Sequence, residues 1–157
     1  MKTSRELTLK LAAPADAALI ALMSRELIEA GLPWSWTPER VARNLVQADT
    51  LVLTARDGAA LAGFAIMQFG DERAHLSLLA VRPDCRRQGV ARRILEWLTA
   101  SALTAGIASV QLELRASNLD AQRFYLSQGY AETERIPGYY RGLETALRMR
   151  RNIRVKS

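Results

Sequence analysis

The chain has 157 residues, of which 49% are hydrophobic and 24% are charged, and its net charge is +6. This length and composition suit one compact core and predict a single domain over residues 1–157. The one cysteine, Cys85, excludes an intramolecular disulfide, and no apolar run of about 18 residues predicts a membrane span. Residues 7–13 are too short for an export signal, so we expect a cytoplasmic protein.

Two helices are predicted in the first third of the chain. Residues 14–30 carry apolar side chains at helical spacing, and Thr37 followed by Pro38 is typical of the start of a second helix. Trp34 and Trp36 lie in the linker between these helices. The two indoles either fill the loop against the core or form a wall of an acceptor-binding site.

A hairpin and a third strand follow. Residues 51–54 and 61–68 are predicted as antiparallel strands, because Asp57 and Gly58 between them are a strong turn signal. Residues 75–81 are predicted as the next strand, and the largely apolar run at 76–81 predicts burial on both faces.

The middle of the chain predicts a crossover between two parallel strands. A helix with an apolar stripe from Val90 to Ala102 ends at Gly106, and residues 108–115 then alternate between apolar and polar side chains. A connection of this length and type makes the strands at 75–81 and 108–115 parallel.

The last third of the chain predicts a short helix and a final hairpin. Asn118 is expected to cap the helix, Gly129 to close it, and residues 130–136 and 143–149 to pair as strands. The predicted fold class is therefore α/β, with a mixed sheet, a central βαβ crossover and a C-terminal antiparallel hairpin. The exposed edge of that hairpin leaves a homodimer open.

The turn before the central helix has the composition of an anion site. Gly89 opens the helix, and Arg86, Arg87 and Arg92 lie on either side of it. Unpaired N–H groups and the macrodipole at a helix start favour a phosphate, and guanidinium groups bind phosphate oxygens. A pyrophosphate is the natural ligand, although many helices start on a glycine beside arginines that are only solvated.

Most of the positive charge lies near the C-terminus. Residues 141–157 hold six basic residues against the single acidic residue Glu144, which accounts for +5 of the net charge. No aromatic residue is interleaved from Arg148 onward to stack on bases, so a solvated strand and a basic tail over about residues 150–157 are favoured over a nucleic-acid surface. A basic nucleic-acid-binding module is kept as the non-enzymatic alternative. A third interpretation is that these basic residues attract an acidic partner.

Two motifs give nearly the whole chain a resemblance to the GCN5-related N-acetyltransferases. The acetyl-CoA turn of this family is matched by Arg86, Gly89 and Ala91, with Val81 and Pro83 before them. Its second block is matched by Asn118, Ala121, Tyr125, Gly129 and Tyr130.

Within this superfamily the chain is most similar to the RimI-like enzymes, which acetylate the N-terminal α-amine of a ribosomal protein. Residues 33–35, residues 112–118 and the pair Tyr139-Tyr140 followed by Glu144 and Met149 carry the similarity. The resemblance implies direct acetyl transfer from acetyl-CoA to a primary amine in a ternary complex. A protein or peptide amino terminus is the expected acceptor, and a small-molecule amine or a lysine side chain is the alternative.

The resemblance also implies where acetyl-CoA and the acceptor bind. The expected cofactor contacts are the backbone of Leu79, Ala80 and Val81 along the pantetheine, the residues Arg86, Arg87, Gln88, Gly89, Val90, Ala91 and Arg92 at the pyrophosphate, and Asn118 near the pantetheine. The expected acceptor pocket is lined by Trp34, Trp36, Tyr139 and Tyr140. A closed aromatic pocket favours small amines, and an open groove favours peptides. A metal is not expected, since the chain offers no clustered ligand set.

Acid–base roles fall on two residues. In the RimI-like pattern Glu113 matches the proton acceptor and Tyr125 the proton donor. The alternative for Glu113 is a sheet carboxylate that only pairs with an arginine, and the alternative for Tyr125 is a half-buried helix tyrosine without a catalytic role. His75, the only histidine, is the rival base, and Cys85 as a nucleophile is less favoured than either.

Overall fold

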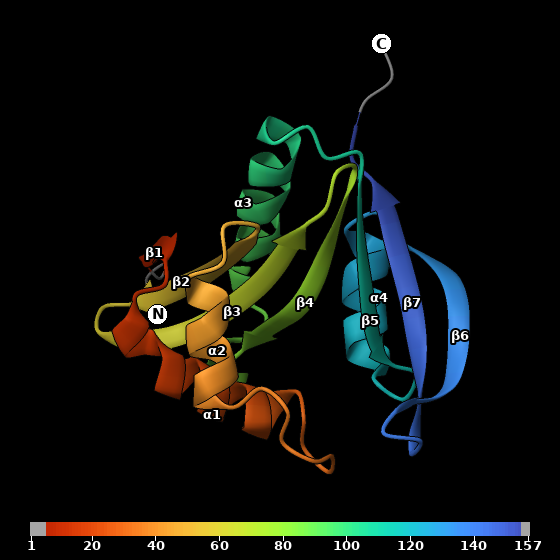
Figure 1. Ribbon diagram of the computed structural model, residues 1–157, viewed down its shortest axis with the longest axis horizontal. Coiled ribbons are helices and arrows are strands. Elements are labelled where there is room, and N and C mark those ends of the chain that lie inside the picture. Colours follow the sequence, from red (N-terminus) through yellow and green to blue (C-terminus); the bar gives the residue numbers. More distant parts are fainter. Residues whose placement is uncertain (1–5, 155–157) are drawn as a thin grey trace. The chain divides into compact units, whose positions relative to one another are not determined.

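The computed structural model describes residues 6–154, which form two compact units (Figure 1). The first unit holds residues up to 67 together with 78–98, and the second holds residues 68–77 together with those from 99 onward. The strands are β1 (Leu7–Leu11), β2 (Thr50–Asp57), β3 (Ala60–Phe69), β4 (Arg73–Val81), β5 (Ser109–Arg115), β6 (Ala131–Tyr140) and β7 (Glu144–Asn152). The helices are α1 (Ala17–Leu27), α2 (Pro38–Leu45), α3 (Val90–Thr104) and α4 (Leu119–Ser127), with short 3₁₀ turns at Pro14–Asp16 and Pro83–Cys85.

The described strands form one mixed sheet in the order β1-β2-β3-β4-β5-β7-β6. Strand β4 is parallel to β5, and α3 connects them, so the predicted βαβ crossover is confirmed. Strand β7 lies between β5 and β6 and runs antiparallel to both, which confirms the C-terminal hairpin. The α/β fold class predicted from the sequence is therefore confirmed.

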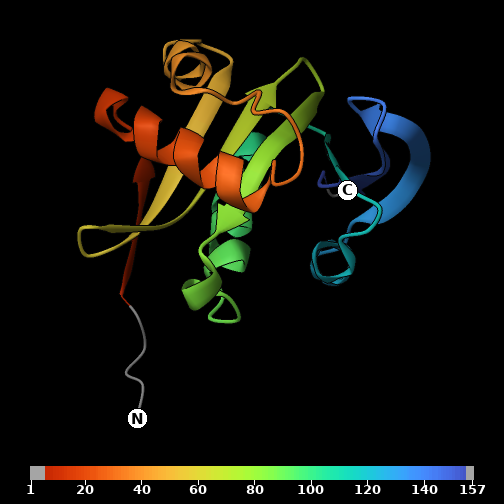
Figure 2. The same ribbon diagram turned by 90° about the horizontal axis from the view of Figure 1, so that it is seen from below.

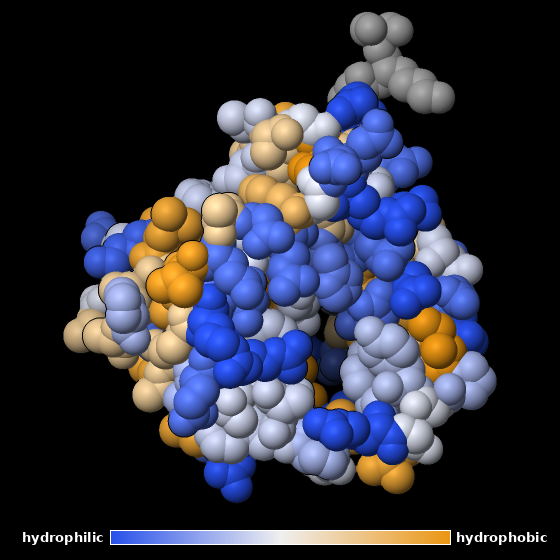
Figure 3. Space-filling model, viewed as in Figure 1, coloured by the Kyte–Doolittle hydropathy of each residue, from blue (hydrophilic) through white to orange (hydrophobic). Residues whose placement is uncertain are grey.

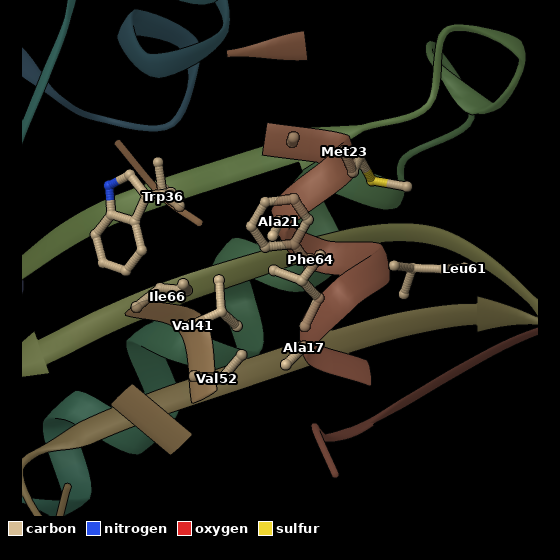
Figure 4. Close-up of a cluster of buried hydrophobic side chains, with 12 residues drawn as sticks. Ala17, Ala21, Met23, Trp36, Val41, Val52, Leu61, Phe64 and Ile66 are labelled. Carbon is tan, nitrogen blue, oxygen red and sulfur yellow. The ribbon is translucent and has the colours of Figure 1, made fainter. Parts of the chain in front are cut away.

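The first unit is built around apolar side chains from its strands and helices. Figures 1 and 2 show α1 and α2 on one face of β2 and β3, and the first turns of α3 on the other. Helix α2 starts as predicted, with the Thr37 hydroxyl accepting a hydrogen bond from the Arg40 N–H at 3.3 Å. Buried side chains from both helices pack against Phe64 and Ile66 of β3, and Trp36 lies at one end of this cluster (Figure 4).

Strand β1 is an element that the sequence analysis did not assign. It pairs antiparallel with β2, from Leu7 opposite Asp57 to Leu11 opposite Leu53. Strand β1 has only five residues, lies at one edge of the sheet, and has three exposed residues. It therefore lacks the long apolar alternation that identifies a strand in the sequence.

The prediction that β4 is buried on both faces is wrong. Ala74, Leu76 and Ala80 are buried, whereas the alternate residues His75 and Ser77 are only partly buried. The cause is a polar cluster on that side of the strand, because His75 contacts a carboxylate of β5 instead of an apolar layer.

Part of the positive charge near the C-terminus is paired within the second unit. Arg148 forms ion pairs with Glu113 and Glu134, and Arg154 donates to the carbonyl oxygen of Gly106. Lys156, which belongs to the predicted basic tail, lies outside the described residues.

On the face seen in Figure 3 the exposed apolar side chains form small separate patches among hydrophilic ones. Among the described helices, none is both long and apolar enough to cross a membrane.

Gly63 on β3 occupies a position with no space for a side chain. A Cβ there would lie 2.7 Å from the Ala80 carbonyl oxygen, 3.2 Å from Val81 Cγ2 and 3.3 Å from Ile94 Cδ1. The absence of a side chain therefore lets β3 approach the end of β4 and the start of α3.

We predict that Gly63→Ala destabilises the protein by about 1–3 kcal/mol, because a backbone oxygen must move to relieve the contact. Urea denaturation would show a lower midpoint with an unchanged slope. A midpoint equal to that of the wild type would show that these strands tolerate a Cβ at this position.

Candidate active site

The anion turn, residues 82–91 of the first unit, has an unusual backbone. Arg87 and Gly89 have positive φ angles of 62° and 78°, and the first hydrogen bond of α3 runs from the Arg93 N–H to the Gly89 carbonyl at 3.0 Å. The N–H groups of Val90, Ala91 and Arg92 therefore have no partner within the helix ladder. Alternating backbone conformations followed by a helix start form a concave set of N–H donors, which fits a phosphate group.

Side chains hold this turn in shape. The Arg86 guanidinium donates to the carbonyl oxygen of Val81 at 3.2 Å, and the Gln88 amide donates to the carbonyl oxygen of Asp84 at 3.2 Å. Arg87 and Arg92 are exposed, so their guanidinium groups are accessible to a phosphate. Cys85 is fully buried, so its thiol is not accessible to a substrate.

Glu113 of β5 lies at the centre of a polar cluster in the second unit. Its Oε1 accepts hydrogen bonds from His75 Nε2 at 2.6 Å and from the Tyr139 hydroxyl at 3.4 Å. Its Oε2 accepts from Arg148 Nε at 2.9 Å and from Gln111 Nε2 at 3.5 Å. We call these five residues the Glu113 cluster. It combines two of the alternatives from the sequence, because the carboxylate is paired with an arginine and also contacts the rival base.

The cluster keeps the carboxylate ionised. Burial raises the pKa of Glu113, but hydrogen bonds from His75 and Arg148 and their charges outweigh burial and lower it to about 2. The register places Arg148 of β7 directly opposite Glu113, and Arg148 also donates to Glu134 of β6 at 2.6 Å. With Gln111 on β5 and Tyr139 on β6, four strands therefore supply donors to one charge.

Tyr125 of α4 is buried, and its ring makes edge contacts with Phe124 and Tyr130 at centroid distances of 5.1 and 5.5 Å. Burial raises the pKa of Tyr125 above its ordinary value, so the phenol keeps its proton at neutral pH. The neighbouring Tyr130 also has its pKa raised by burial, to about 12. Its buried hydroxyl has no hydrogen-bond partner among the described residues.

The four aromatic residues predicted for the acceptor pocket fall into two pairs. Tyr139 and Tyr140 of β6 lie in the second unit, with ring centroids 5.0 Å apart, and Tyr139 is exposed. Trp34 and Trp36 lie in the first unit, where the Trp34 indole donates to the Ala21 carbonyl oxygen at 3.2 Å. Trp36 is only 8% exposed and its ring is covered by the Arg40 guanidinium at 3.8 Å, which favours its packing role.

A buried carboxylate that the sequence analysis missed fixes the linker with the two tryptophans. Glu29 accepts hydrogen bonds from the Ser24 hydroxyl at 3.0 Å, from the Ser35 N–H at 2.7 Å and from the Ser35 hydroxyl at 2.6 Å, as well as from the Trp36 N–H. Its only sequence signal is an acidic residue among the apolar positions at the end of the first helix. Within residues 6–154, no group of three or more side chains suited to a metal ion occurs.

Comparisons with known proteins agree with this geometry. Residues 23–151 match the acetyltransferase (GNAT) domain family. Over 90 residues the chain is 41% identical to a [ribosomal protein bS18]-alanine N-acetyltransferase of Salmonella typhimurium, an alignment that covers 57% of this chain. The chain spans 60% of the length of that relative.

Solved structures extend the similarity over the whole fold. The crystal structure of the ribosomal-protein-S18-alanine N-acetyltransferase from Escherichia coli superimposes with a TM-score of 0.83 at 30% sequence identity, and 97% of each chain is covered. Ard1 from Thermoplasma volcanium superimposes with a TM-score of 0.82 at 22% identity, covering 95% of this chain and 99% of its own, and supports the fold. The resemblance seen in the sequence is therefore confirmed, and the chain belongs to the GNAT family of acetyltransferases.

Proposed function

We propose that this protein is an acetyl-CoA-dependent N-acetyltransferase whose acceptor is the α-amine of a protein or peptide amino terminus. The observation that carries the proposal is the anion turn, where the positive φ angles of Arg87 and Gly89 precede the unpaired N–H groups of α3. The similarity to S18-alanine N-acetyltransferases supports the choice of acceptor. Lysine side chains and small amines are the alternatives that an assay must separate from it.

The proposed acetyl-CoA contacts lie along β4, the anion turn and Asn118. The backbone of Leu79, Ala80 and Val81 would hold the pantetheine as an added strand would be held. The N–H groups of residues 88–91, with Arg87 and Arg92, would bind the pyrophosphate, while Arg86 maintains the turn through Val81. The Asn118 side-chain oxygen already accepts from the Ala121 N–H at 3.1 Å, so a cofactor contact would use its amide NH₂ group. Bound acetyl-CoA supplies the thioester whose C–S bond is broken.

The transfer needs one group to take a proton and another to give one. The acceptor nitrogen loses a proton and bonds to the acetyl carbon, and the departing thiolate gains a proton. We propose the Glu113 cluster for the first role and the Tyr125 hydroxyl for the second. Direct transfer from an α-ammonium of pKa near 8 to a carboxylate whose pKa is lowered to about 2 is strongly unfavourable, so Glu113 acts together with the groups bonded to it.

We propose acceptor contacts for Trp34 in the first unit, where Trp36 packs in the core, and for Tyr139 and Tyr140 in the second unit.

We also propose a cytoplasmic location. A homodimer would use β6, which ends the strand order and whose residues 131–135 are exposed. The pairing of Arg148 with two carboxylates disfavours a nucleic-acid surface on β7.

A direct test of the acceptor uses two synthetic peptides. We expect acetyl-CoA-dependent acetylation of a peptide with a free N-terminal alanine, detected by mass spectrometry. The same peptide with a blocked amino terminus and an internal lysine is the control, and we expect it to stay unmodified. Acetylation of the lysine peptide alone would move the acceptor to a side chain.

We predict that Gly89→Glu weakens acetyl-CoA binding at least about 100-fold in calorimetric titration, because the new carboxylate repels phosphate and the positive φ strains the backbone. Gly106→Glu is the matched control. Gly106 also has a positive φ, of 82°, but follows the other end of α3 with open space around it. Unchanged affinity in Gly89→Glu would remove the anion turn from the cofactor site.

We predict that Tyr125→Phe lowers kcat by about 10²–10⁴-fold and leaves acetyl-CoA affinity close to that of the wild type, since only the proton donor is lost. Tyr130→Phe is the matched control, because it removes a neighbouring buried hydroxyl that bonds to no described residue. Steady-state kinetics beside calorimetry separates the two effects. Equal loss in both variants would indicate a general effect on packing instead of proton donation.

A further inference from the structure

The Glu113 cluster is proposed to accept the proton, and His75 is one of its five members. It is the only histidine in the chain. Its ring lies between Glu113 Oε1, 2.6 Å from Nε2, and the Ser77 hydroxyl, 3.2 Å from Nδ1. The side chain is 38% exposed, whereas that of Glu113 is 6% exposed.

The contact with Glu113 fixes which ring nitrogen is basic. An ionised carboxylate can only accept hydrogen bonds, so His75 Nε2 must carry the hydrogen that it shares with Glu113. In the neutral ring the lone pair then lies on Nδ1. The Ser77 hydroxyl donates to this lone pair over 3.2 Å, which is long for an O–H donor. A substrate N–H group could replace so weak a partner.

Glu113 itself offers little room to a substrate. Each of its oxygens already accepts two hydrogen bonds, Oε1 from His75 and Tyr139 and Oε2 from Arg148 and Gln111. The donors from Tyr139 and Gln111 are long, at 3.4 and 3.5 Å, but the Glu113 side chain is only 6% exposed, against 38% for His75. The half-exposed imidazole is therefore the more accessible basic group in the cluster.

Charged and polar groups from four strands surround His75. Glu113 on β5 lies against Nε2 and orients the ring. Arg148 on β7 pairs with Glu113 and also with Glu134 on β6, the latter at 2.6 Å. Arg73 on β4 donates to the Gln111 side chain at 3.3 Å, and Tyr139 contributes a neutral hydroxyl.

We infer that His75 Nδ1 takes the proton from the acceptor amine and that Glu113 is the positioning residue that orients the ring and stabilises its charged form. This inference rests on the proposed function. The α-ammonium first releases one proton to water, and the neutral amine then gives a second proton to Nδ1 as its nitrogen bonds to the acetyl carbon. The C–S bond breaks, and the thiolate takes its proton separately. The exposed edge of His75 then returns its proton to water.

The decisive variant is His75→Gln, whose side-chain amide can still donate to Glu113 but has no basic nitrogen. With the N-terminal alanine peptide, we expect kcat/KM to fall about 10²–10⁴-fold while acetyl-CoA affinity and the urea midpoint stay near wild type. Arg73→Gln, on the same strand face, is the control and keeps the wild-type kcat/KM.

Two further measurements separate a positioning role from a structural one. Because the chain has a single histidine, nitrogen NMR of the wild type reports its tautomer directly, and we expect Nε2–H in the neutral form. Glu113→Gln should weaken this preference and lower kcat/KM. The double variant His75→Gln/Glu113→Gln should be no slower than His75→Gln alone, since the two residues act as a unit.

The outcomes distinguish this inference from the proposed function. If the wild type acetylates the peptide and His75→Gln retains the wild-type kcat/KM, the assignment of His75 is overturned and the proposed function stands. A neutral ring protonated on Nδ1 in the NMR experiment would also overturn it. If the wild type acetylates no peptide and binds no acetyl-CoA, the proposed function fails and this inference fails with it.

Discussion

The ionised carboxylate of Glu113 is the constraint on which the second unit depends. A buried charge is costly unless donors surround it, and here the donors come from β4, β5, β6 and β7. The carboxylate therefore ties the parallel strand pair to the C-terminal hairpin. Removing one partner would leave a buried charge incompletely compensated, so the register of these strands and the chemistry of the site are set by the same group.

The anion turn follows a different principle, because it relies on the backbone. Its ligand donors are N–H groups that the start of α3 leaves unpaired, and the positive φ angles of Arg87 and Gly89 direct the chain around them. Arg86 and Gln88 use their side chains to bind carbonyl oxygens of the same segment. Most of the affinity for a phosphate would then depend on backbone shape, so we expect Gly89 to matter more for binding than any single arginine of the turn.

The sequence predicts the features that depend on local spacing. The caps at Thr37 and Asn118 are found as expected, with side-chain oxygens accepting from the N–H groups three residues later. The alternation in residues 108–115 gives β5 with the expected buried face. These predictions succeed because a cap or an alternation is written within a few neighbouring residues.

Features that depend on pairing between distant strands were not predictable in the same way. His75 and Glu113 are both polar residues on predicted strands, but their contact requires the register that places His75 opposite Gln111. Arg148 is opposite Glu113 only because β7, and not β6, lies beside β5. The same missing information made β4 look apolar on both faces.

The environments of Glu113 and Tyr125 move their pKa values in opposite directions, and this contrast gives the second unit its capacity for acid–base chemistry. Hydrogen-bond donors and nearby positive charge outweigh burial at Glu113, so the carboxylate gives up its proton, whereas burial among aromatic rings makes the Tyr125 phenol keep its own. Neither group exchanges a proton readily with a neutral amine. An imidazole that donates its Nε2 hydrogen to the carboxylate keeps a lone pair on Nδ1, so in the proposed reaction His75 would accept the proton that Glu113 is too acidic to take.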